Sequence, residues 1–117
     1  MVRLISFDID GTLEVGDPPG LVTLEAVRQA HALGFFVGSC SDRTLSNQKS
    51  LWEEHELPMH FTVLKQGLEG LRSEFDAEHY LHIGDSAIDR VMADRAGFDF
   101  VHAIDDDVEA FLEQHIR

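Results

Sequence analysis

Two aspartates, Asp8 and Asp10, stand where an apolar segment runs into a glycine turn. If that segment is a strand, side chains at these two positions point to the same side, so their carboxylates lie close together. Clustered anions repel each other and lose hydration, and they persist only beside a cation, a shared proton or several hydrogen-bond donors. A solvated Asp-x-Asp turn is the alternative interpretation of this pair taken alone.

Further polar groups recur along the chain, each at or just past the end of an apolar segment. Ser41 follows one segment, Lys65 closes a second, and Asp85 follows a third, with Asp89 further along the same stretch. In open parallel sheets, ligands bind beyond the carboxyl ends of the strands. The spacing therefore predicts a single polar site at one edge of a sheet.

The elements expected to position these groups alternate between strands and amphipathic helices, a pattern typical of βαβ units around a parallel sheet. Strands are expected over residues 2–7, 35–40, 61–64, 80–83 and 98–101. Helices are expected over residues 24–33, 44–55, 67–75 and 87–96, with a terminal helix from the acidic run 105–107 to about residue 116. The length of 117 residues predicts one domain, 1–117, with an α/β fold. We expect a Rossmann-like three-layer sandwich around a central parallel sheet of about five strands.

The segment Asp8–Leu13 (Asp-Ile-Asp-Gly-Thr-Leu) resembles the first motif of the haloacid dehalogenase-like (HAD) hydrolases, most of which are phosphatases. Phe35–Ser41 is similar to the second motif, an apolar strand ending in Ser or Thr, and Lys65 to the third. His82–Asp89 is similar to the fourth motif. The resemblance runs from about residue 2 to residue 103.

The resemblance implies a phosphohydrolase in which Asp8 is the nucleophile and forms an aspartyl-phosphate. Asp10 would be the general acid and later the general base. A carboxylate is repelled by a phosphate dianion unless a cation lies between them, and Mg²⁺ suits a site of one or two carboxylates. The expected metal ligands are Asp8, the backbone carbonyl of Asp10, and Asp85. Asp89 is expected to hold a metal-bound water or to orient Lys65.

Ser41 precedes an expected helix start, where a hydroxyl and free N–H groups make an anion site. Ser39 is its competitor, since the strand could end two residues earlier. Arg43 is interpreted either as a contact to a substrate anion or as part of a surface ion pair. Gly11 and Thr12 belong to the substrate-binding groups that we expect from the resemblance.

Lys65 is expected to neutralise phosphoryl oxygens in the transition state. The chain has one other lysine, Lys49, which lies in an expected helix among polar neighbours and is interpreted as solvated. The family often has Lys-Pro at this motif, whereas Gln66 follows here. His82 and Trp52 are interpreted as packing residues and receive no functional role.

The composition restricts the partners. Asp and Glu number 22 against 9 Lys and Arg, a formal net charge of −13, which disfavours nucleic acids and anionic membranes. One cysteine, Cys40, allows no internal disulfide. No targeting segment or long apolar run is visible, so we expect a cytoplasmic protein.

Compared with many relatives in that family, the chain has no room for an inserted cap domain. Only Glu14–Val22 separates the first motif from the first helix, and Leu64–Gly67 offers no space either. An open site is expected to take a phosphoprotein, or a small phosphoester covered by a homo-oligomer. Two other classes remain: a phosphoacceptor module similar to response-regulator receivers, and a catalytically inactive domain that binds metal or a partner.

Overall fold

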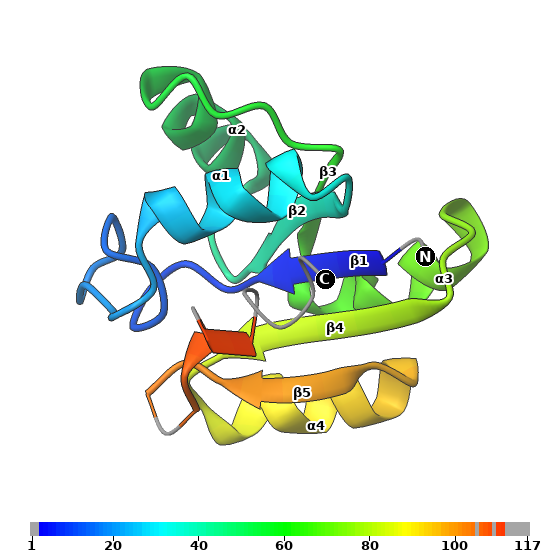
Figure 1. Cartoon of the computed structure of the whole chain (residues 1–117). Coiled ribbons are helices and arrows are strands. Elements are labelled where there is room, and N and C mark those ends of the chain that lie inside the picture. The colour runs from blue at the N-terminus through cyan, green and yellow to red at the C-terminus, as the bar shows by residue number, and fades with distance from the viewer. Residues whose placement is uncertain (1–2, 105, 109, 112–117) are drawn as a thin grey trace.

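The computed structural model describes residues 3–104, 106–108 and 110–111. It is an α/β fold with one sheet of five parallel strands in the order β3-β2-β1-β4-β5 (Figure 1). The strands are β1 (Arg3–Phe7), β2 (Phe36–Ser41), β3 (Phe61–Leu64), β4 (His79–Gly84) and β5 (Asp99–His102). The helices are α1 (Leu24–Ala32), α2 (Leu45–Glu54), the 3₁₀ helix η1 (Lys65–Gly70), α3 (Leu71–Glu74) and α4 (Ala87–Ala96).

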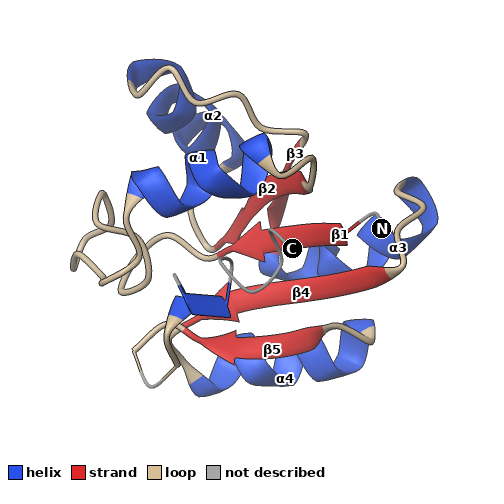
Figure 2. Ribbon diagram, in the orientation of Figure 1, coloured by secondary structure: helices blue, strands red, loops and turns tan. Residues whose placement is uncertain are grey.

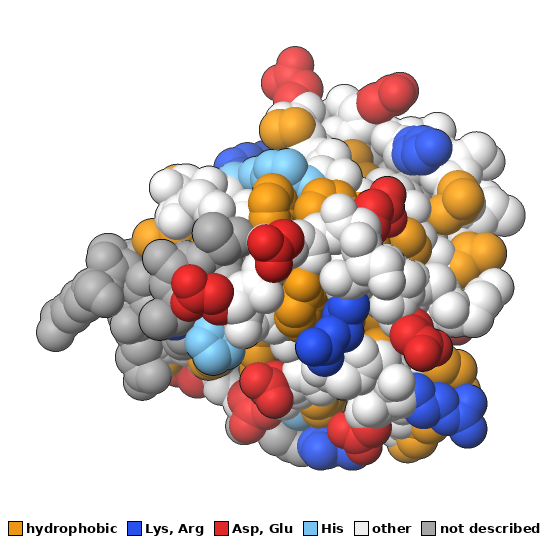
Figure 3. All heavy atoms as spheres, turned by 90° about the vertical axis from the view of Figure 1, so that its right-hand side faces the viewer, with side chains coloured by type: hydrophobic (Ala, Val, Ile, Leu, Met, Phe, Trp, Pro, Cys, Tyr) orange, Lys and Arg blue, Asp and Glu red, His pale blue; other side chains and the backbone are white. Residues whose placement is uncertain are grey.

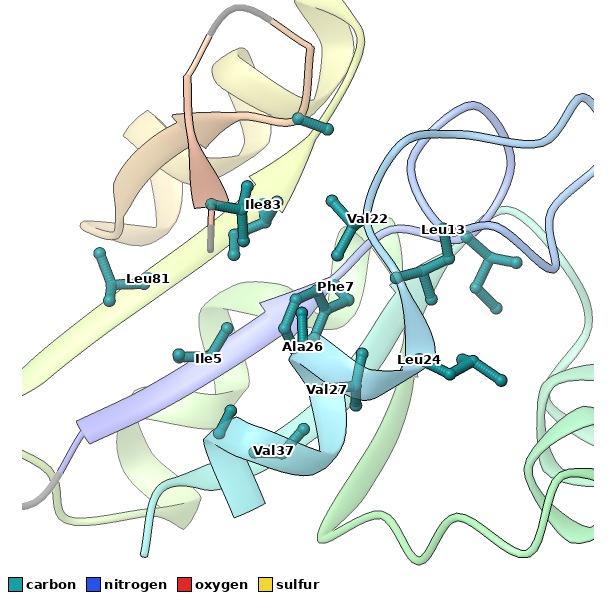
Figure 4. Packing of buried hydrophobic residues seen from close by; sticks show 14 of the residues in the cluster. Ile5, Phe7, Leu13, Val22, Leu24, Ala26, Val27, Val37, Leu81 and Ile83 are labelled. Carbon is teal, nitrogen blue, oxygen red and sulfur yellow. The ribbon is translucent and has the colours of Figure 1, made fainter. Parts of the chain in front are cut away.

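Helices cover both faces of the sheet, which makes the three layers expected from the sequence (Figure 2). On one face, α1 packs against alternate residues of the strands, including Ile5, Phe7 and Ile83 (Figure 4). On the other face, Leu4 packs with residues of η1, α3 and α4. The central strand β1 therefore buries apolar side chains on both faces, as expected for a parallel sheet between helices.

Hydroxyl and carboxylate caps fix where the helices begin. Thr23 accepts from Ala26 N at 3.1 Å before α1, and Thr44 accepts from Asn47 N at 3.1 Å before α2. Each hydroxyl satisfies a backbone donor that has no partner within its helix. Asp107 accepts from Ala110 N at 3.0 Å, which confirms the expected acidic cap of the terminal helix. Most of that expected helix lies outside the described residues.

The helix expected over residues 67–75 is present but begins two residues earlier, and its first part is a 3₁₀ helix. The chain turns into 3₁₀ geometry directly after β3, and only Leu71–Glu74 is α-helical. Gly67 and Gly70 lie in this stretch, and glycine costs up to about 1 kcal/mol in an α-helix relative to alanine. The early turn matters for the site because it places Lys65 in the first residue of η1 instead of at the end of a strand.

The loop that connects β1 to α1 is short and ordered by its own hydrogen bonds. It is closed at its base by a bridge between Leu13 and Val22. Gly11 N donates to Pro18 O at 2.7 Å and Gly20 N donates to Leu13 O at 2.8 Å, so the loop folds back on the strand end. No inserted domain interrupts the described residues between β1 and β5, as expected.

Candidate active site at the carboxyl edge of the sheet

The polar groups predicted from the sequence come to the same edge of the sheet. Asp8 follows β1, Ser41 ends β2, Lys65 follows β3, and Asp85 follows β4. The strand order runs outward from β1 in both directions, so the topological switch point lies at the end of β1. Figure 3 shows the opposite, amino-terminal edge, where acidic and basic side chains are interspersed with hydrophobic ones. The candidate site is thus at the edge where this class of sheet binds ligands.

Asp8 is the buried centre of the site. Only 4% of the residue is exposed, and its Oδ1 accepts a hydrogen bond from Ile9 N at 2.8 Å. Burial, assisted by the neighbouring Asp89 carboxylate, raises the pKa of Asp8 to about 8. An ionised Asp8 therefore requires more positive charge than the chain itself supplies.

Three carboxylates meet here: Asp8, Asp85 and Asp89 each offer an oxygen within 4.8 Å of the others. Thr12 Oγ1 donates to Asp85 Oδ1 at 3.4 Å. Gly11 has φ +75°, and a Cβ added there would lie 2.0 Å from Asp85 Oδ2. Any side chain at position 11 would displace Asp85, so the glycine of the Asp-Gly-Thr turn is required by this close approach.

Asp89 is fully buried and its oxygens are already occupied. Oδ1 lies 2.9 Å from His82 Nε2 and 3.5 Å from Lys65 Nζ. Oδ2 accepts from Ser86 N at 3.2 Å and from Ser86 Oγ at 2.7 Å. Asp89 N donates to Ser86 Oγ at 3.3 Å, which completes a capping box at the start of α4. Burial alone would raise the pKa of Asp89, but the hydrogen bonds from His82 and Ser86 outweigh it and hold the pKa below its ordinary value.

Four donors saturate an ionised carboxylate, which has about four lone-pair sites. Of the two roles considered for Asp89, this geometry favours orientation of Lys65 over contact with a metal or its water.

Lys65 lies among three carboxylates and is only 8% exposed. Its Nζ is 3.6 Å from Asp8 Oδ2, 3.5 Å from Asp42 Oδ2 and 3.5 Å from Asp89 Oδ1. Burial lowers the pKa of Lys65, but the three carboxylates outweigh burial and raise it, so the side chain stays an ammonium. Lys49 is exposed on α2, as expected.

Asp10 does not join the carboxylate cluster. Its carboxylate accepts from Arg43 Nη2 at 2.6 Å and Nε at 3.1 Å, and from Asp17 N at 2.8 Å. The hydrogen bonds from Arg43 are the largest cause that lowers the pKa of Asp10. Arg43, for which the sequence left two interpretations, is therefore ion-paired with Asp10 at the entrance of the site.

The two serines of β2 lie in different surroundings. Ser39 Oγ donates to Gln48 Oε1 at 2.7 Å and accepts from Trp52 Nε1 at 2.9 Å, so it is occupied in the interior. Ser41 is the last residue of β2, and its Oγ accepts from Arg43 N at 3.1 Å. Ser41 is thus the better placed of the two to face a ligand at the carboxyl edge.

Two buried polar residues support the site: Ser6, which the sequence did not single out, and His82, which was expected only to pack and is indeed buried. Both have no exposed surface, and they are paired across β1 and β4 with Ser6 Oγ 3.0 Å from His82 Nδ1. Gln48, also fully buried, donates to the carbonyls of Arg43 and Val63 and ties the ends of β2 and β3 together. The available signal was a polar residue in the interior of an otherwise apolar strand or helix face.

A hollow of about 440 Å³ lies elsewhere, against α2. It is lined by Lys49, Trp52, Glu53, Glu56, Leu57, Pro58, Met59 and Thr62. No member of the carboxylate cluster borders it. Because none of the clustered carboxylates borders this hollow, we place the chemistry at the strand ends.

Neither the family models nor the curated proteins with which the chain was compared give a match. Within the described residues, none of the helices has both the length and the apolar character needed to cross a membrane.

Proposed function

We propose that the chain is a Mg²⁺-dependent phosphohydrolase that cleaves a phosphomonoester through an aspartyl-phosphate on Asp8. The observation that carries the proposal is the buried Asp8 carboxylate, set against the Lys65 ammonium in a three-carboxylate cluster at the switch point of the sheet. The resemblance to HAD hydrolases supports it through the same residues. The alternative is an inactive domain of the same fold that binds a metal or a partner.

The donor set fits a hard divalent cation. All three clustered side chains offer oxygens, and Asp89 is saturated by its donors, which leaves Asp8 and Asp85 to bind. Mg²⁺ prefers one or two carboxylates together with waters. Asp8, Asp85 and the main-chain carbonyl of Asp10 would hold it, and a cation there would neutralise the phosphate dianion that faces Asp8.

The residues of the chain then divide the reaction between them. An Asp8 oxygen attacks phosphorus, the bond to the leaving oxygen breaks, and Asp10 gives that oxygen its proton. Water next attacks the aspartyl-phosphate and loses its proton to Asp10, which frees Asp8 and inorganic phosphate. Lys65 stabilises the charge on the phosphoryl oxygens, while Ser41, Thr12 and the backbone at Gly11 bind and orient the group.

The substrate class is a phosphomonoester, on a small molecule or on a protein, and we propose no nucleic acid or membrane partner. The acidic composition, with a net charge of −13, supports this choice. The short loop between β1 and α1 leaves the site without a cap, so a homo-oligomer covering it is part of the proposal.

Hydrolysis of an aryl phosphate, measured with Mg²⁺ and with EDTA, tests the function. We expect turnover only with the cation. Asp85→Asn is expected to raise the Mg²⁺ concentration for half-maximal activity by roughly tenfold or more, since it removes a charged oxygen ligand. Asp94→Asn, an exposed acid on α4, is the matched control and should leave that concentration unchanged. Cation binding without any turnover would favour the inactive domain.

Replacing Arg43 with glutamine tests Asp10 as the acid. Arg43 lowers the pKa of Asp10, so its removal lets that pKa rise. A general acid must be protonated, and the alkaline limb of the kcat/KM profile is therefore expected to move to higher pH in Arg43→Gln. Arg28→Gln, which changes an exposed arginine on α1, should leave the limb in place. A limb that moves to lower pH in Arg43→Gln would contradict the role of Asp10.

A further inference from the structure

We propose that His82 is a positioning residue that holds the Lys65 ammonium beside Asp8, acting through Asp89. The effect of His82 on catalysis rests on the proposed function, whereas the contacts between His82, Asp89 and Lys65 do not. The contacts form one buried chain from Ser6 through His82 and Asp89 to Lys65 and then to Asp8.

Strand register creates the first half of this chain. Ser6 of β1 pairs directly with His82 of β4, and both side chains lie on the face of the sheet that α4 covers. The capping box at the start of α4 fixes Asp89 above them, with Oδ2 held by Ser86. The remaining oxygen, Oδ1, then meets His82 Nε2 at 2.9 Å.

The chemistry of the partners decides which ring nitrogen carries hydrogen. An ionised carboxylate accepts hydrogen bonds and donates none, so His82 Nε2 must donate to Asp89. His82 Nδ1 then accepts from the Ser6 hydroxyl, which lies 3.0 Å away. Ser6 thus fixes the tautomer that His82 needs, in the way that outer hydrogen bonds orient ligating and catalytic histidines.

The hydrogen bond from His82 affects Lys65, because both side chains contact the same oxygen, Asp89 Oδ1. Its Nζ stands 3.5 Å from Asp89 and 3.6 Å from Asp8, nearly equidistant between the two carboxylates. The imidazole donor withdraws charge from Oδ1 and so weakens the pull of Asp89 on the ammonium. Without that donor, Oδ1 attracts Lys65 more strongly, and the ammonium moves toward Asp89 and away from the phosphoryl site beside Asp8.

A histidine that only packs would also be buried and hydrogen-bonded, so the test must report on Lys65 itself. The chain has two lysines, and Lys49 is exposed. With ¹⁵N-labelled lysine, the buried Lys65 ammonium is expected to exchange slowly and give an NMR signal, assigned by its loss in Lys65→Met. Exposed Lys49 exchanges fast and does not interfere.

His82→Phe keeps an aromatic ring at this buried position and removes the donor, and it is expected to shift or broaden the Lys65 signal. It should also lower kcat for the aryl phosphate by roughly 10–100-fold while KM changes little. The glutamine amide in His82→Gln can donate to Asp89, so this variant should keep a Lys65 signal and a kcat close to those of wild type. Ser6→Ala should change the Lys65 signal and kcat in the same direction as His82→Phe, but by a smaller amount.

Tyr80→Phe is the matched control because it lies on the same strand and face and loses hydrogen bonds to Phe75 and Ala77. A Lys65 signal and a kcat in His82→Phe equal to those of Tyr80→Phe would overturn the proposal. A chain that hydrolyses no phosphoester, but whose Lys65 signal still responds to His82→Phe, would overturn the hydrolase function and support the positioning role.

Discussion

Asp8→Asn is expected to lower aryl phosphate hydrolysis by roughly 10³-fold or more, because the variant has no carboxylate oxygen to attack phosphorus. The substitution changes a single buried atom type and keeps the side-chain shape, so the fold should persist. Single-turnover and steady-state rates with saturating Mg²⁺ measure the effect. Activity within a few-fold of wild type would remove Asp8 from the mechanism.

The same variant is expected to stabilise the metal-free protein. Burial and Asp89 raise the pKa of Asp8 from 3.8 to about 8, so the folded chain keeps a proton there that the unfolded chain releases. Asp8 makes its full contribution to the stability of the wild-type protein at pH values below its pKa in the unfolded chain. That contribution is lost as the pH rises toward the pKa of Asp8 in the folded chain. Asparagine has no such proton to lose, so the stability advantage of Asp8→Asn should grow over that pH range.

Chemical unfolding in EDTA across this pH range measures the advantage. Mg²⁺ should reverse the ranking, since the cation stabilises a chain with an ionised Asp8 more than one with an amide. A wild-type stability that rises with pH relative to Asp8→Asn would contradict the buried, protonated Asp8.

Lys65→Met is expected to have the second largest effect. It removes the cation that lies between Asp8 and Asp89 and leaves the buried, ionised Asp89 without its ion-pair partner. Breaking a buried ion pair by removing one partner costs about 3 kcal/mol or more. Hydrolysis should fall by roughly 10²–10³-fold with the loss of a charge that stabilises the transition state.

Lys49→Met is the control for that experiment, since it removes the only other lysine and from an exposed position. Its free energy of unfolding should stay within about 0.5 kcal/mol of wild type. If the two lysine variants were equally stable and equally active, Lys65 would be no more than a solvated surface charge.

Much of this fold could be predicted because local patterns and global topology agree. Each strand is a short apolar run bounded by turn residues, and each of the five lies within one or two residues of its expected position. The helix expected over residues 67–75 is present, but its type and start could not be foreseen, because periodicity cannot show that the chain tightens into 3₁₀ geometry at Lys65. That detail depends on how η1 packs against its neighbours, which is a tertiary property.

In the candidate site, too, some residues could be placed from the sequence, whereas other contacts depend on the tertiary structure. Strand ends could place Asp8, Ser41, Lys65 and Asp85 at one edge, since parallel strands share a direction. The ion pair of Arg43 with Asp10 depends on loop conformation, and no spacing rule yields it. His82 was interpreted as a packing residue because its partner Ser6 is far away in the sequence and becomes its neighbour only through strand register.

The most direct test of the central claim is to identify the residue that carries the phosphoryl group. During turnover of an aryl phosphate with Mg²⁺, an acid quench followed by borohydride reduction converts an aspartyl-phosphate to homoserine, which peptide mass spectrometry locates. We expect homoserine at position 8, present only when both substrate and cation were added. Homoserine at another aspartate, or none in a chain that is turning over, would contradict the account.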